Sequence, residues 1–400
     1  MAAPSKPSTV FAAIGILSHG APGQRNWTRA SFLSRTARRA AAAHGLVVRF
    51  VMRAEGASTA IQREADEHGD MVLVPAPANA GRASGPLLSL MLWWRHAVAT
   101  WPSAQFIGKA DDDVYIHLIG TMNHLAAAQR AVAEAYGHAE PRIYWGAFEA
   151  YHYEEADMRP VRFQQDRPGK CFRRQHNESG MLHGPFAFAR GPLYFLSASL
   201  ITTLLSDAWV NADLNRTLAA LARLDSVRER RRSRRRGASA ALPSMVWEDV
   251  YTGYLLSKVI APTPPTLALV EHGVGNGGAN PVYSDGFGMQ LAPSTLIWHM
   301  RNKHRTAHRI AFAHHWLEES GRHCLPPPSS WPWVRCGYLR LASGRGMSTS
   351  CSGARWLRCT TRRDAYGPAA CSGSLTELKH AADAWLANRS GVTPGGHVLV

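Results

Sequence analysis

The sequence predicts an α/β protein in which a parallel sheet carries helices on both faces. In the N-terminal half, short apolar runs alternate with longer helix-like stretches, which is the rhythm of βαβ units. The 400 residues are 46% apolar and 18% charged, which is typical of a soluble globular chain and excludes collagen-like, coiled-coil and wholly disordered classes. Three consecutive aspartates follow one apolar run, at the strand end where open α/β sheets bind ligands.

The N-terminal elements follow from the spacing of apolar residues and turn formers. Residues 10–17 form an apolar run with β-branched side chains that ends in the turn-forming sequence HGAPG, which favours a buried strand over a signal peptide. The further predicted strands are 46–52, 71–74, 105–108 and 142–148. The predicted helices are 28–43, 58–68, 85–100 and 118–135.

The C-terminal half is less regular. Residues 151–184 are polar and rich in His, Arg and Gln, which predicts a loop, and residues 186–205 return to apolar order. A helix is predicted up to residue 259, before a proline cluster, and a strand at 295–299. We expect one domain over residues 8–320 and a Cys- and Trp-rich appendage over residues 321–400.

The charge balance is strongly basic, with 45 Lys and Arg against 29 Asp and Glu and a formal net charge of +16. Such an excess invites a polyanionic partner. The run RERRRSRRR, from Arg228 to Arg236, carries seven arginines and one glutamate and so supplies +6 of that charge. Binding of a single-stranded nucleic acid needs aromatic residues on which bases stack, and none is interleaved with this run. We therefore expect a solvated, disordered insertion over about residues 226–239 and no nucleic-acid partner, with a polyanion site as the alternative.

Cysteine placement and glycosylation sequons favour a secretory compartment. Of six cysteines, five crowd the last quarter of the chain without the paired spacing of a zinc site. Four sequons begin at Asn26, Asn177, Asn215 and Asn388. No run approaches the ~20 apolar residues that span a membrane. We expect membrane association only through an N-terminal anchor that this chain does not contain.

The aspartate triplet is the first candidate site. Three adjacent carboxylates repel one another, so their position beside an apolar strand predicts a compensating cation. In an extended segment Asp111 and Asp113 project from the same side and can share one metal, while Asp112 points elsewhere. Carboxylate oxygens suit Mg²⁺ or Mn²⁺, which often bridge a protein to a diphosphate. The alternative is an exposed acidic turn.

Two further groups could complete this site. Glu248 and Asp249 precede an apolar helix, where a carboxylate either caps the helix or accepts a proton from an attacking hydroxyl. His299 ends an apolar run, and a neutral imidazole is a good additional ligand for Mn²⁺. A structural role for His299 is the alternative, and spacing alone does not decide either case.

Several motifs together resemble the inverting β1,3-glycosyltransferases of glycosyltransferase family 31, which include β1,3-galactosyltransferases and β1,3-N-acetylglucosaminyltransferases. The resemblance covers roughly residues 10–310. It rests on four segments in order: WPSA at 101–104, QFIGKADDDVY at 105–115, GPFAFARGPLYFLS at 184–197 and EDVYTG at 248–253. Departures occur at the early arginine pattern, where Arg25, Trp27, Arg29 and Arg35 lie at other spacings, and at Phe188-Ala189-Arg190.

The resemblance implies a GT-A fold with a Rossmann-like mixed sheet flanked by helices. It implies Mn²⁺ and a UDP-sugar donor, with Asp113 as the main metal ligand beside Asp111 and His299. By the same resemblance, Asp249 is the catalytic base. Donor contacts are implied for Lys109, Asp111, Asp112 and Glu248.

The expected activity is metal-dependent, inverting transfer of a hexose, galactose or N-acetylglucosamine, in β1,3 linkage. The acceptor is a glycan or glycoprotein, and the expected location is the Golgi lumen. The alternative function is non-catalytic binding of a glycan or polyanion on the same scaffold.

Overall fold

The computed structural model describes residues 9–19, 22–136, 142–154, 159–162, 182–234, 247–260, 267–271, 283–285, 296–299, 314, 334–339 and 356–361. Among these residues, no helix is both long and apolar enough to cross a membrane. Most of the expected appendage, 321–400, lies outside the described residues.

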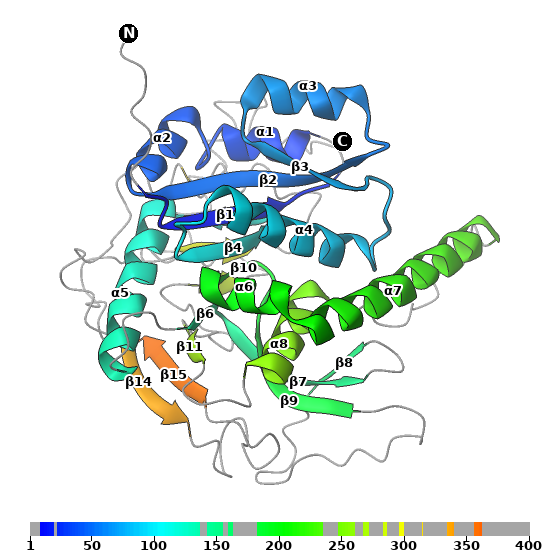
Figure 1. Ribbon diagram of the computed structural model, residues 1–400. Helices are drawn as coiled ribbons and strands as arrows, with labels where there is room; N and C mark the ends of the chain where they lie inside the picture. The colour runs from blue at the N-terminus through cyan, green and yellow to red at the C-terminus, as the bar shows by residue number, and fades with distance from the viewer. Residues whose placement is uncertain are drawn as a thin grey trace, which may run out of the picture.

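A nine-stranded mixed sheet forms the centre of the described structure (Figure 1). Its strands, in spatial order, are β14 (Val334–Leu339), β15 (Trp356–Thr361), β11 (Ala268–Glu271), β6 (Ile143–Gly146), β10 (Leu193–Ser197), β4 (Phe106–Asp111), β1 (Ala12–Leu17), β2 (Leu46–Glu55) and β3 (Met71–Pro77). Strands β1 to β4 are parallel, as the sequence predicts. Strand β10 runs antiparallel between β4 and β6. The predicted mixed α/β class is therefore confirmed.

Helices cover the two faces of this sheet. The helices are α1 (Gly23–Arg29), α2 (Arg35–Ala43), α3 (Thr59–His68), α4 (Gly85–Thr100), α5 (Leu118–Tyr136), α6 (Ala198–Ser206), α7 (Ala208–Arg234) and α8 (Glu248–Val259). Because strand side chains alternate in direction, Ile14 packs in one apolar core with α2 and α5, and its neighbour Ala13 packs in a second core with α4, α6 and α8. Figure 1 shows α4, α6 and α8 beside one another.

The predicted helix over 28–43 is divided in two. Helix α1 ends at Arg29, and α2 begins at Arg35 because the Ser34 hydroxyl accepts a hydrogen bond from the Ala37 amide at 3.2 Å. A serine in this position satisfies one of the free N–H groups of a first helical turn. The capping chemistry of Ser34 therefore overrides the continuous helical pattern.

The predicted loop over 151–184 is wrong for part of its length. Strand β7 (Phe148–Glu154) pairs with β8 (Arg159–Arg162) and with β9 (Leu182–Ala189), and both pairs are antiparallel. Polar composition does not prevent strand formation, because ladder hydrogen bonds come from the backbone. The remaining residues of that range lie outside the described ones.

The Arg-rich insertion expected over 226–239 is also partly wrong. Residues up to Arg234 continue helix α7, and Figure 1 shows the end of α7 extending beyond the neighbouring elements. Arg, Ala and Leu are good helix formers, and they dominate the second half of α7. The Asp225 carboxylate fixes the helix just before the arginines by accepting the N–H groups of Ala83 and Ser84 at 3.0 and 2.9 Å.

A small sheet completes the region that carries the acidic triplet. Strand β5 (Val114–Ile116) pairs antiparallel with β13 (Ile297–His299), which pairs parallel with β12 (Tyr283–Asp285). In this register His299 lies opposite Val114, one residue after the triplet. The pairing brings two segments together that are far apart in the sequence.

Candidate active site

The acidic triplet lies on the turn between β4 and β5. Asp111 is the last residue of β4, and its N–H donates to the Pro192 carbonyl at 3.1 Å. Across the β5–β13 pairing, the Nε2 atom of His299 lies 3.6 Å from Oδ1 of Asp113. The candidate ligand atoms of Asp111, Asp113 and His299 all lie within 4.8 Å of one another. The structure thus brings together the three residues expected to bind metal.

These three side chains fit a divalent cation. Two carboxylates and an imidazole form a donor set that suits Mn²⁺, and three atoms this close can contact one ion between them. Asp113 is buried, while the Asp111 side chain is 35% exposed. A buried carboxylate beside a second one is unfavourable without a compensating positive charge. The Lys109 ammonium already lies 2.6 Å from Asp111, so it is the donor chemistry that favours a metal ion here.

Asp112 points away from this group, as expected. Its Oδ2 atom accepts a hydrogen bond from the Ser18 hydroxyl at 3.3 Å, and its carbonyl accepts one from the Gln24 side chain at 2.8 Å. Ser18 belongs to the segment that joins β1 to α1, and Gln24 lies in the first turn of α1. The middle residue of the triplet therefore fixes the turn to that part of the chain.

Lys109 is a buried residue that contacts the acidic groups. Its side chain is fully buried, and Nζ lies 2.6 Å from both Asp111 Oδ1 and Glu248 Oε1. Nζ also donates to the Gly191 carbonyl at 2.8 Å. Burial alone would lower the pKa of Lys109, but the two carboxylates raise it above the usual value. Lys109 is therefore a charged link between β4, Gly191 in the segment before β10, and α8.

Asp249 is the second residue of helix α8 and also contacts Gly191. Its Oδ2 atom accepts the Gly191 N–H at 2.9 Å, and its Oδ1 atom accepts the Val250 N–H at 2.8 Å. Burial raises the pKa of Asp249 to about 7, and the neighbouring Glu248 charge acts in the same direction. Trp247 occupies the N-cap position without a side-chain hydrogen bond, so Asp249 is not the helix cap. Its carboxylate instead accepts one N–H of the first turn and has a raised pKa.

Gly191 is the residue around which these groups converge. A Cβ atom at this position would lie 3.2 Å from Lys109 Nζ, 3.3 Å from Asp111 Oδ2 and 3.4 Å from Asp249 Oδ2. Both carboxylates therefore lie close to a position where a side chain larger than a hydrogen atom would be crowded. This close approach joins the candidate metal ligands to the candidate base.

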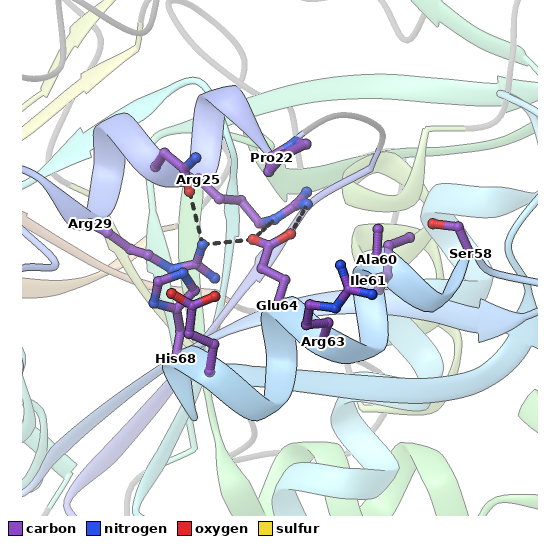
Figure 2. A pocket seen from close by; sticks show the side chains of 11 residues that line it. Pro22, Arg25, Arg29, Ser58, Ala60, Ile61, Arg63, Glu64 and His68 are labelled. Atoms are coloured by element: carbon purple, nitrogen blue, oxygen red, sulfur yellow. Dashed lines mark hydrogen bonds and ion pairs between the residues drawn. The ribbon is translucent and has the colours of Figure 1, made fainter.

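A separate cavity of about 810 Å³ lies between α1 and α3 (Figure 2). In its wall Arg25, Arg29 and Glu64 form ion pairs, with both Arg25–Glu64 and Arg29–Glu64 separations of 2.6 Å. Sequence reasoning noted these arginines only as departures from a family pattern. The signal that it missed is the i, i+4 spacing of the two arginines, which places both side chains on one helix face. The full lining is Pro22, Arg25, Asn26, Arg29, Ser58, Ala60, Ile61, Arg63, Glu64, Glu67 and His68.

Comparisons with known proteins show what part of the chain is similar to. The galactosyltransferase family model matches residues 23–212, which include the acidic triplet and Gly191. A glycosyltransferase involved in the glycosylation of the major capsid of PBCV-1 is 9% identical, with 75% of this chain and 98% of that chain covered and a TM-score of 0.32. Mannose-1-phosphate geranyltransferase from Thermus thermophilus is 13% identical, with 65% and 73% covered and a TM-score of 0.28. Residues 23–212 are therefore similar to the galactosyltransferase family, and this match supports glycosyl transfer in general.

Proposed function

We propose that the protein is a metal-dependent, inverting hexosyltransferase. The donor is a UDP-sugar, galactose or N-acetylglucosamine, and the sugar is transferred in β1,3 linkage to a glycan or glycoprotein acceptor. The observation that carries this proposal is the convergence of Asp111 and Asp249 on Gly191, with Asp113 and His299 beside Asp111. A cation site and a proton acceptor then lie within one small volume, as glycosyl transfer from a nucleotide sugar needs.

The donor end of the reaction uses Asp111, Asp113 and His299. These residues would hold Mn²⁺, which would supply electrostatic stabilisation of the leaving diphosphate. The Lys109 ion pairs hold the Asp111 carboxylate at the end of β4, so the ligand geometry is set before the donor binds. Lys109 itself has three protein acceptors and acts through them rather than by touching the donor.

The acceptor end of the reaction uses Asp249. Its carboxylate takes the proton of the acceptor hydroxyl while the acceptor oxygen forms a bond to the anomeric carbon. The bond from that carbon to the diphosphate oxygen breaks on the opposite face, so the configuration inverts. A base whose pKa is about 7 is well matched to catalysis near neutral pH, because a large fraction is unprotonated and still basic.

The location we propose is the Golgi lumen. It is supported by the galactosyltransferase family match and by the sequons at Asn26 and Asn215, both of which are exposed. We also propose that the protein associates with the membrane and acts on a glycan or glycoprotein acceptor there.

The test is donor turnover with a panel of UDP-sugars, in Mn²⁺ and in EDTA. We expect one donor to be consumed in Mn²⁺ only. Asp113→Ala should abolish turnover, and Asp249→Asn should lower kcat by about 10²- to 10⁴-fold, the usual contribution of a general base. Asp66→Asn, an exposed carboxylate on α3, is the matched control and should change neither.

Two results would contradict the proposal. Turnover that persists in EDTA would exclude metal dependence. Full activity of Asp249→Asn would exclude Asp249 as the catalytic base. If the folded protein binds Mn²⁺ and UDP but consumes no donor with any acceptor, the binding alternative replaces catalysis.

A further inference from the structure

Helix α1 is held in place by charges rather than by apolar packing. Its buried residues are Arg25 and Thr28, and its first turn has no side-chain cap. Arg25 is fully buried and binds Glu64 of α3 in a bidentate manner, with Nε–Oε1 at 2.8 Å and Nη2–Oε2 at 2.6 Å. A paired guanidinium and carboxylate fix both distance and orientation.

A second pair of contacts extends this network. Arg29 binds the same Glu64 through Nη1 at 2.6 Å, and it binds Asp70 through Nε and Nη2, both at 2.9 Å. Asp70 is 1% exposed, so its charge is compensated by protein groups rather than by water. Burial alone would raise the pKa of Glu64, but Arg25 and Arg29 lower it to about 2. Glu64 is therefore fully charged at neutral pH.

The network reaches the acidic triplet through the Ser18 hydroxyl. Arg25 Nη1 donates to Ser18 Oγ at 3.2 Å, and Ser18 Oγ donates to Asp112 Oδ2 at 3.3 Å. The neighbouring Gln24 donates to the Asp112 carbonyl at 2.8 Å. A continuous series of polar contacts thus runs from α3, through α1, to the turn between the two carboxylates that fit a cation.

We propose that Glu64 and Arg25 are positioning residues, which act through Ser18 and Asp112 to fix the Asp111–Asp113 turn for cation and nucleotide binding. The functional part of this inference rests on the proposed function, but the positioning itself does not. Because the buried residues of α1 are Arg25 and Thr28, its ion pairs set where Ser18 and Gln24 lie. The position of the Asp111–Asp113 turn therefore depends on α3, which is distant from it in the sequence.

Direct binding of a donor phosphate by Arg25 is the competing role, and the geometry disfavours it. Nε and Nη2 are engaged by Glu64, Nη1 is engaged by Ser18, and the side chain is 0% exposed. The two roles predict opposite effects of Glu64→Gln. Loss of the Glu64 charge would free Arg25 for an anion and strengthen nucleotide binding, whereas loss of positioning would weaken it.

The experiment compares Glu64→Gln, Ser18→Ala and the double variant with Arg63→Gln in the full chain. Arg63 is an exposed cation on the same helix, and within the described part of the chain its side chain takes part in no ion pair. The first measurement is hydrogen–deuterium exchange of the peptide covering residues 106–117. The second is calorimetric titration with UDP in the presence of Mn²⁺.

We expect faster exchange of that peptide and a Kd for UDP and Mn²⁺ weakened by roughly 3- to 30-fold in each single variant, the range of coupled contacts. The double variant should be no worse than the more affected single variant, because both changes interrupt one route. Arg63→Gln should match the wild type. If Glu64→Gln does not fold, Ser18→Ala leaves the ion pairs intact and decides the question alone.

Three results would overturn the inference: unchanged exchange in folded variants, tighter UDP binding by Glu64→Gln, or additive effects in the double variant. If the wild type binds neither Mn²⁺ nor UDP, the proposed function fails. The exchange measurement then still decides whether Glu64 and Ser18 fix the turn.

Discussion

Lys109→Met replaces the buried charge that joins β4 to α8, and we expect it to destabilise the folded protein strongly. The change removes the ion pairs of Nζ with Asp111 and Glu248, both at 2.6 Å, and a hydrogen bond to the Gly191 carbonyl. Methionine fills a similar volume, so the change in the free energy of unfolding reports the loss of charge rather than the formation of a cavity.

The magnitude follows from how well water can reach the two carboxylates left behind. Removing one partner of a buried ion pair lowers the free energy of unfolding by about 3 to 5 kcal/mol, because the other charge stays buried without compensation. The Asp111 side chain is 35% exposed and regains water, whereas Glu248 is only 13% exposed and does not. We therefore expect the lower end of that range, about 3 kcal/mol.

The assay is urea unfolding followed by circular dichroism, with Lys258→Met as the control. Lys258 is an exposed lysine of α8, and its replacement should change the free energy of unfolding by less than about 0.5 kcal/mol. A loss below about 1 kcal/mol for Lys109→Met would refute the reasoning, since it would mean that Glu248 finds water or another partner.

Two further predictions concern Asp249 and Asp225. Burial raises the pKa of Asp249 to about 7, so its proton-accepting form is lost as pH falls through 7. The acid limb of kcat/KM should then fall about tenfold per pH unit below that point. Because the Lys109 charge lowers the Asp249 pKa, Lys109→Met should move this limb to higher pH; activity that rises as pH falls would contradict the role of Asp249 as base. Asp225→Asn should lower the free energy of unfolding by about 1 to 2 kcal/mol, because the carboxylate caps the start of α4 through the Ala83 and Ser84 amides and the Ser84 hydroxyl. Urea unfolding beside the exposed control Asp66→Asn tests this, and an equal stability of the two variants would exclude the cap.

The sequence by itself determined the local pattern of the protein. Apolar runs with period two or near-continuous apolarity marked β1, β2, β3 and β4, because a strand buried between two helical layers must be apolar on both faces. The acidic triplet at the end of β4 and the Glu248–Asp249 pair at the start of α8 were visible as residue types at element ends. Both signals are local, and both were read correctly as positions in the fold.

Tertiary structure alone decided how those positions meet. Lys109 reaches the Gly191 carbonyl across 82 residues and Glu248 across 139, and no spacing in the sequence specifies such contacts. The ion pairs between α1 and α3 are decided in the same way. Periodicity reports which side of an element is buried, whereas the choice of partner depends on how distant elements pack, so only the folded chain joins the triplet, the buried lysine and Asp249 into one site.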